Sequence, residues 1–142
     1  MTKFRLDRII EVKEKLIEEK EGELETALHM LNELTASILT IEKDIEATYK
    51  EMTIPSLSGG DFSVLKDYTT YLSDKRLLMI EEKEDMERRI LTLRANLVNL
   101  MKELKMLETL KSKTYKAMRK FENRKEQKNL DGMALRLGER RI

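Results

Sequence analysis

The sequence predicts an all-α fold: an antiparallel two-helix coiled-coil hairpin with a protruding C-terminal helix. Three observations support this prediction. Apolar residues repeat every seven positions in two long stretches, and a single break separates the stretches. The composition also suits long helices, with 39% charged residues, 5% aromatic residues and one proline among 142 residues. Such a composition favours helices that bury a narrow seam over a domain that encloses a pocket. We expect one coiled-coil domain over residues 1–142.

The first predicted helix covers about residues 4–52. One heptad position is apolar throughout this stretch, at Ile10, Ile17, Leu24, Leu31, Ile38, Ile45 and Met52. The companion position is apolar at Ala27 or Leu28, Leu34 and Ile41. Lys13 and Lys20 interrupt that second position. The unbroken heptad repeat predicts a left-handed supercoil, because a straight helix would rotate its apolar stripe away from a partner.

The break lies at residues 53–61, with the sequence TIPSLSGGD. Pro55 cannot continue a helix, and Gly59-Gly60 can adopt positive φ angles. Asp61 stands directly before the next apolar-periodic stretch, where it is a good helix N-cap. We therefore predict a turn over residues 53–61.

The second predicted helix covers about residues 62–128. Its main heptad position holds Leu65, Leu72, Met79, Met86, Leu93, Leu100 and Leu107, and Thr114 and Phe121 continue the register. The second stripe contains Ile90, Leu97, Leu104 and Met118. We expect the remaining residues, 129–142, to form a basic tail.

A hairpin centred on this turn pairs residues whose numbers sum to roughly 114. Ile10 then lies near Leu104, and Phe4 lies near Leu110. Everything after about residue 112 extends past the first helix without a partner. The alternative is a dimer in which the two helices pair with those of a second chain. The short turn favours pairing within one chain, because it lowers the entropic cost of bringing the helices together.

The near-zero net charge of +1 conceals an uneven distribution. Residues 1–52 contain 8 basic and 13 acidic side chains, whereas residues 111–142 contain 11 basic and 4 acidic side chains. A helix that is both basic and apolar on one stripe is expected to dock onto a partner. A solvated helix end is the simpler interpretation, and the absence of a clear stacking platform argues against a nucleic-acid partner.

The sequence shows no constellation for catalysis, a metal or a cofactor. His29 is the only histidine and there is no cysteine, so neither a multi-histidine nor a thiolate metal site can form. Gly59-Gly60 lacks the spacing of a phosphate-binding loop. The many acidic residues are typical of solvated coiled-coil flanks, and a pair of catalytic carboxylates would need a cleft that two helices do not provide. We predict a non-enzyme without cofactors.

The charged first twenty residues lack the apolar core of a secretory signal, and no uncharged stretch is long enough to span a bilayer. We therefore expect a cytoplasmic protein.

Aromatic residues gather on both sides of the turn, at Tyr49, Tyr68 and Tyr71. Tyr71 and Leu78 each precede a seam residue by one position, so they share one flank of the second helix. Two interpretations remain open for this flank. Its side chains either pack at the end of the hairpin or form a docking surface for a partner.

The sequence resembles the FliJ family of the bacterial flagellar type III protein-export apparatus. The resemblance lies in the opening F-x-L-x-x-I-x-x-V-K-E at Phe4–Glu14, in DFSVLKDYTTYLSDK after the turn, and in K-E-Q-K-x-L-D-x-x-A at Lys125–Ala134. It covers nearly the whole chain. Injectisome stalk proteins share this shape, and the pattern does not separate the two systems.

The resemblance implies an antiparallel coiled coil similar to the central stalk of rotary ATPases. It implies three partners, which are the export ATPase FliI, the export gate protein FlhA and export chaperones, with contact to the membrane only through the gate. The gate contact implied here is Tyr49, Tyr71 and Leu78, although Lys75 and Glu82 interrupt this surface. The ATPase contact is expected at Tyr115, Met118, Arg119, Lys120, Phe121 and Arg124. The competing hypothesis is a structural or regulatory coiled-coil adaptor unrelated to an ATPase.

Overall fold

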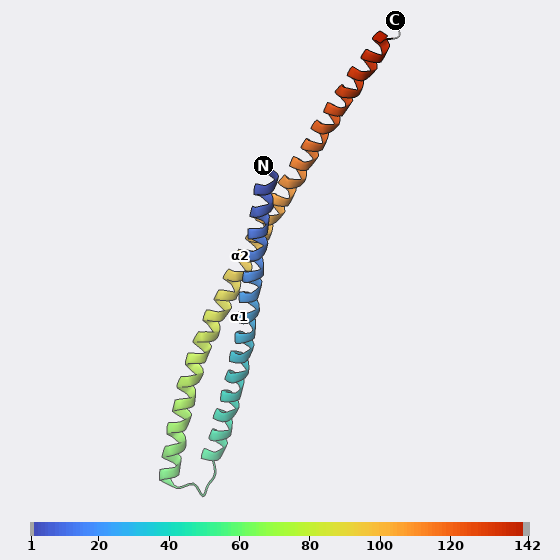
Figure 1. Ribbon diagram of the computed structural model, residues 1–142. Coiled ribbons are helices and arrows are strands. Elements are labelled where there is room, and N and C mark those ends of the chain that lie inside the picture. Colours follow the sequence, from blue (N-terminus) through green and yellow to red (C-terminus); the bar gives the residue numbers. More distant parts are fainter. Residues whose placement is uncertain (1, 141–142) are drawn as a thin grey trace. The chain divides into compact units, whose positions relative to one another are not determined.

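The computed structural model describes residues 2–140, which form two helices, α1 (Thr2–Met52) and α2 (Gly59–Arg140), and no strand (Figure 1). Side-chain burial is described for residues 5–138. The two long helices pack against each other, which confirms the predicted all-α hairpin.

Residues 53–58 form the turn, and their hydrogen bonds satisfy the C-terminal end of α1. The backbone N–H and the hydroxyl of Thr53 both donate to the carbonyl oxygen of Lys50, at 3.3 and 2.7 Å. The N–H of Leu57 donates to the carbonyl oxygen of Ile54 at 3.2 Å. This bond closes a β-turn with Pro55 at its second position, where the fixed φ of proline is favoured.

Ser58, and not the predicted Asp61, caps the N-terminus of α2. The Oγ of Ser58 accepts a hydrogen bond from the N–H of Asp61 at 3.1 Å, and its carbonyl accepts one from Phe62 at 2.9 Å. Asp61 therefore lies inside the first turn, where its carboxylate faces the positive end of the helix dipole. No glycine of the described chain has a positive φ, so Gly59-Gly60 are helical and α2 begins three residues earlier than predicted.

α2 also continues beyond residue 128, the expected end, to Arg140. The added segment contains no proline, and Leu, Met, Ala and Arg favour the helix. The amide of Gln127 donates to Asp131 at 3.4 Å, one helical turn away. Gly132 and Gly138 weaken this helix but do not end it, because each costs only about 1 kcal/mol relative to alanine.

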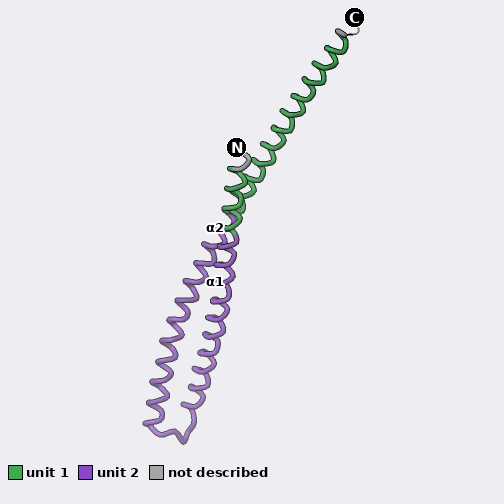
Figure 2. The backbone as a smooth tube through the Cα atoms, in the orientation of Figure 1, with its two compact units in different colours: residues 1–17, 99–142 green, residues 18–98 purple. Residues whose placement is uncertain are grey.

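The chain divides into two compact units, which Figure 2 shows in different colours: residues 18–98 form one, and residues 1–17 with 99–142 form the other. In the unit of residues 18–98, a buried cluster of Ala27, Ile90 and Leu93 joins the two helices. The half-buried apolar residues around it are Leu24, Leu28, Leu31 and Met86. This cluster consists of predicted seam residues.

Near the turn the same seam becomes polar at Thr48 and Thr69, both buried. Their hydroxyls are satisfied locally, because Thr48 donates to Asp44 O at 2.7 Å and Thr69 donates to Leu65 O at 2.9 Å. Thr69 also lies 3.8 Å from the sulfur of Met52. The first turns of α2 therefore extend past the end of α1.

In the unit of residues 1–17 and 99–142, Ile10 and Ile17 of α1 are buried, and Leu100, Leu104 and Leu107 of α2 are half-buried. Lys13 and Lys111 occupy companion seam positions, and each pairs with an acidic side chain of the other helix. The Nζ of Lys13 lies 2.6 Å from Glu103, and that of Lys111 lies 2.5 Å from Asp7. These polar contacts make this stretch of seam less apolar than the cluster of the other unit.

The structure corrects the predicted register by about one helical turn. The predicted register sets residue 107 opposite Asp7, whereas Asp7 pairs with Lys111. The reason is the offset at the turn, where Met52 lies beside Thr69. The predicted contact of Phe4 with Leu110 involves a side chain outside the described residues.

Every predicted heptad residue from Ile10 to Met52 and from Leu65 to Thr114 is buried or half-buried. Met118 and Phe121 continue the register but are exposed.

Candidate partner-binding surfaces

The first candidate surface lies on α2 close to the turn. Tyr71 and Leu78 are 59% and 62% exposed, although each directly precedes a buried or half-buried seam residue. The ring of Tyr71 stacks on that of Tyr68, with centroids 6.5 Å apart and an angle of 25° between the planes. The two rings therefore lie beside each other at the surface in an offset stacked arrangement.

Val64, which the sequence prediction did not name, and Tyr68, which it named only among the aromatic residues near the turn, belong to the same surface. Val64 and Tyr68 are exposed and lie seven and three residues before Tyr71, a spacing that places all three on one face of α2. We name Val64, Tyr68, Tyr71 and Leu78 the turn-proximal patch. Tyr49 is also exposed but lies on α1. The position of Val64, seven residues before Tyr71, could have been recognised from the sequence.

A charged pair lies beside this patch, in the same unit. The Nε of Arg76 donates to Glu42 of α1 at 3.0 Å, and both side chains are partly buried. This bond joins the two helices at a position where the seam of α2 has no apolar residue. It therefore helps to fix the register of the helices that carry the patch.

The second candidate surface is the part of α2 that follows the last pair with α1. From Tyr115 to residue 138 every side chain position is exposed except the half-buried Gly132. The predicted ATPase-contact residues all lie here, at Tyr115, Met118, Arg119, Lys120, Phe121 and Arg124. At 100° per residue, Lys120, Phe121 and Arg124 share one side of the helix, whereas Tyr115 and Arg119 lie on another side. The structure thus brings three of the six together.

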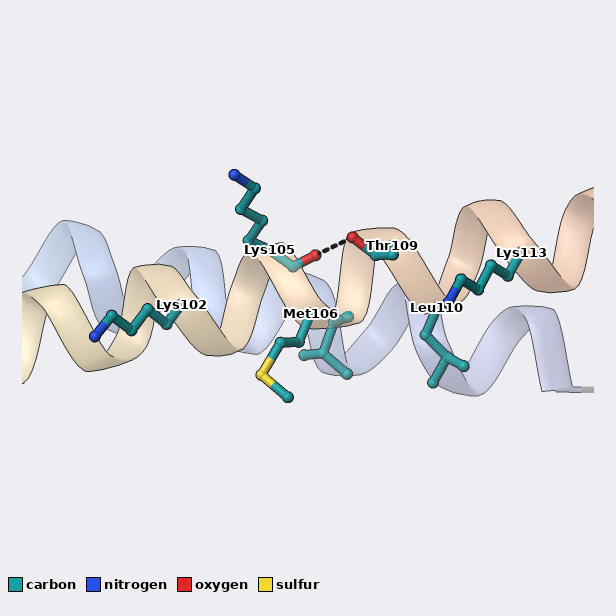
Figure 3. A pocket seen from close by; sticks show the side chains of 7 residues that line it. Lys102, Lys105, Met106, Thr109, Leu110 and Lys113 are labelled. Carbon is teal, nitrogen blue, oxygen red and sulfur yellow. Dashed lines mark hydrogen bonds between the residues drawn. The ribbon is translucent and has the colours of Figure 1, made fainter.

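An open groove of about 770 Å³ precedes this segment on α2. It is lined by Lys102, Lys105, Met106, Leu107, Thr109, Leu110 and Lys113. Met106 and Leu110 project on the same side of the helix, and the hydroxyl of Thr109 donates to the carbonyl oxygen of Lys105 at 2.9 Å (Figure 3). The groove is an apolar strip bordered by lysines, which the sequence prediction did not single out.

One lysine of this unit has a shifted pKa. The hydrogen bond that Lys111 donates to Asp7 and the negative charge of that carboxylate raise the pKa of Lys111 above the ordinary value of 10.5. The ammonium group therefore stays charged at neutral pH, and the pair with Asp7 persists across the physiological range.

The described residues contain no group of three or more histidine, cysteine, aspartate or glutamate side chains that could hold a metal ion. His29 is exposed, and its Nε2 lies 3.0 Å from Glu33 one turn later on the same helix.

Within the described part of the chain, no helix is long and apolar enough to cross a bilayer.

The comparison with known families decides the assignment. A family model described as "Flagellar FliJ protein" matches residues 2–142. The chain belongs to the FliJ family. No curated protein and no solved structure matches the sequence significantly.

Family membership makes this FliJ protein a component of the flagellar protein-export apparatus, and the family is a non-enzymatic part of it. This match confirms the resemblance to the FliJ family that the sequence predicted. That prediction was based on the opening residues, the segment after the turn and the C-terminal motif.

Proposed function

We propose that this FliJ protein acts in the cytoplasm as the central stalk of the export ATPase, which it binds and stimulates. In the same proposal it links the ATPase to the export gate and escorts export chaperones. The observation that carries the proposal is the segment of α2 from Tyr115 to residue 138, which is exposed apart from the half-buried Gly132 and is both apolar and basic. Apolar side chains leave water when a surface covers them, and lysine and arginine side chains favour acidic partners.

A rigid helix end with these properties fits the central opening of an oligomeric ring. Only the assembled ring presents the complete binding surface, so binding favours the ring over free subunits by mass action. We therefore expect this protein to raise the ATPase activity of the cognate export ATPase. The increase should be largest at enzyme concentrations where the ring is only partly assembled.

A truncation series tests this stalk function. Removal of residues 113–142 should abolish the stimulation, because it removes every proposed ATPase contact. The matched control removes only residues 129–142 and retains those contacts. Circular dichroism checks that the helices remain folded in both variants. Equal stimulation by the full chain and by the variant that ends at residue 112 would show that this end of α2 does not contact the ATPase.

The gate contact is proposed for the turn-proximal patch, together with Tyr49 on α1. Leu78→Ala should weaken binding to the purified cytoplasmic domain of the gate protein, whereas Leu77→Ala should not. Leu77 is 58% exposed and next in sequence, but its side chain points about 100° away around the helix. Equal loss in the two variants would argue against a contact specific to this face.

A further inference from the structure

One face of α2 between residues 102 and 128 combines apolar and cationic side chains. At 100° per residue, these side chains lie within about 140° of the helix circumference. The apolar members are Met106, Leu110, Ala117 and Phe121, and the cationic members are Lys102, Lys113, Lys116, Lys120, Arg124 and Lys128. All are exposed, with Met106 at 71% and Phe121 at 69%. We name these ten residues the amphipathic face.

Carboxylates are segregated from this face. Glu108, Glu122 and Glu126 lie on the opposite side of the helix by the same rotation. Glu103 lies at the edge of the face, and its carboxylate pairs with Lys13 at 2.6 Å. Within residues 102–128 the positive charge of the face is therefore not neutralised by acidic neighbours on the same side, and Asp131, which follows the face, accepts a hydrogen bond from Gln127 at 3.4 Å.

We propose that the amphipathic face binds directly to the surface of an anionic lipid bilayer. A helix with this arrangement lies in the plane of a membrane, where apolar side chains enter the boundary between headgroups and acyl chains. The aliphatic stems of lysine and arginine lie along the same boundary, while their charged ends remain at the phosphates. Each such cation near an anionic surface adds about 1 kcal/mol of attraction.

The position of the apolar residues favours a bilayer over a nucleic acid. Met106 and Leu110 lie in the groove between Lys102, Lys105 and Lys113 (Figure 3). Phe121 lines a second hollow with Arg124, Lys125, Gln127 and Lys128. The phosphate backbone of a nucleic acid attracts the lysines but gives methionine and leucine no apolar environment, whereas a bilayer accommodates both kinds of side chain.

This contact shares Lys120, Phe121 and Arg124 with the proposed ATPase contact. The bilayer and the ATPase would therefore compete for this stretch of α2. Binding to lipid requires no other protein, so it can fail while the proposed stalk function holds, and the reverse is also true.

Cosedimentation of the full chain with vesicles tests the charge requirement. The chain should bind vesicles of phosphatidylcholine that contain phosphatidylglycerol, and not vesicles of phosphatidylcholine alone. Neutralising three cations of the face, as in Lys113→Gln with Lys116→Gln and Lys120→Gln, should lower the partition coefficient on the order of 100-fold. The matched control carries Lys15→Gln, Lys43→Gln and Lys66→Gln. It has the same net charge, alters exposed lysines elsewhere and should bind as the unmodified chain does.

Fluorescence tests whether the apolar side chains enter the bilayer. The chain contains no tryptophan, so Phe121→Trp introduces a single reporter. Its emission should shift to shorter wavelengths with the anionic vesicles and be quenched by brominated lipid. Met133→Trp places the reporter on the opposite side of α2, where no shift is expected.

Either of two results would overturn the proposal. One is equal binding of the two triple variants, which would show that only net charge matters. The other is an unshifted Phe121→Trp emission combined with tight binding of duplex DNA, which would identify the face as a nucleic-acid surface.

Discussion

Leu91 and Leu93 provide a direct test of the seam, because they are the same residue type two positions apart on α2. Leu93 is 5% exposed in the cluster with Ala27 and Ile90, whereas Leu91 is 65% exposed. We predict that Leu93→Ala destabilises the protein strongly and that Leu91→Ala changes its stability little. Any effect of helix propensity is common to both substitutions.

The expected magnitude follows from the burial. Leu→Ala removes about three carbon groups, and each buried group contributes about 0.8 kcal/mol, so Leu93→Ala should cost about 2.4 kcal/mol. The cavity contribution should be small, because a seam between two helices can close from its solvated flanks. The largely exposed Leu91 should lose no more than about 0.8 kcal/mol, part of which the better helix propensity of alanine offsets.

Urea denaturation followed by circular dichroism measures this difference. With a slope of about 2 kcal/mol/M, the midpoint of Leu93→Ala should fall by roughly 1 M relative to the unmodified chain. The midpoint of Leu91→Ala should change by a small fraction of that amount. Equal shifts for the two variants would refute the assigned seam.

Three further predictions concern other parts of the chain. Ser58→Ala should destabilise the start of α2 by about 1 kcal/mol through loss of the bond to Asp61, whereas Ser56→Ala, in the turn, should have little effect in the same denaturation assay. Cysteines introduced as Glu42→Cys and Arg76→Cys should be joined by a short bismaleimide within one chain, and products found only between chains would exclude the intramolecular hairpin. The raised pKa of Lys111 means that the contribution of its ammonium group to the pair with Asp7 is present at neutral pH and is lost as the pH rises through the folded-state pKa. Hydrogen exchange of residues 5–17 should therefore accelerate at alkaline pH more in the unmodified chain than in Asp7→Asn, and equal acceleration would contradict the assigned pair.

The seam could be predicted from the sequence because its signal repeats many times. Each heptad from Ile10 to Met52 places an apolar residue on the same stripe of the helix. The polar residue Lys13 therefore did not prevent the seam from being recognised. The turn has no such repetition. Ser58 and Asp61 are both good N-caps, and nothing local to either residue decides between them. The register depends on how far α2 runs past α1, which is set by packing around Met52 and Thr69 and has no local signature.

The candidate surfaces could be predicted in part from the sequence, because some of their residues follow from the heptad repeat. Tyr71 and Leu78 were placed correctly beside the seam, because their positions follow from the heptad register. The sequence prediction named Arg119, Lys120 and Arg124 and otherwise considered the basic surplus only as a total over residues 111–142. That total does not show on which side of α2 the lysines lie, and the face that includes Lys102 and Met106 begins before that range.

The largely exposed segment of α2 over residues 115–138 has a consequence for the thermodynamics of recognition. An isolated helix of this length in water must form a first turn that fixes several residues for one hydrogen bond, and this nucleation step is unfavourable by about three orders of magnitude. Residues 115–138 avoid that step, because they extend a helix whose earlier turns are already held by the packed seam. Fraying can then start only from the C-terminal end, and Gly132 and Gly138 ease it there. A partner that binds near Phe121 consequently meets a preformed helix, and little of the binding free energy is spent on ordering the backbone.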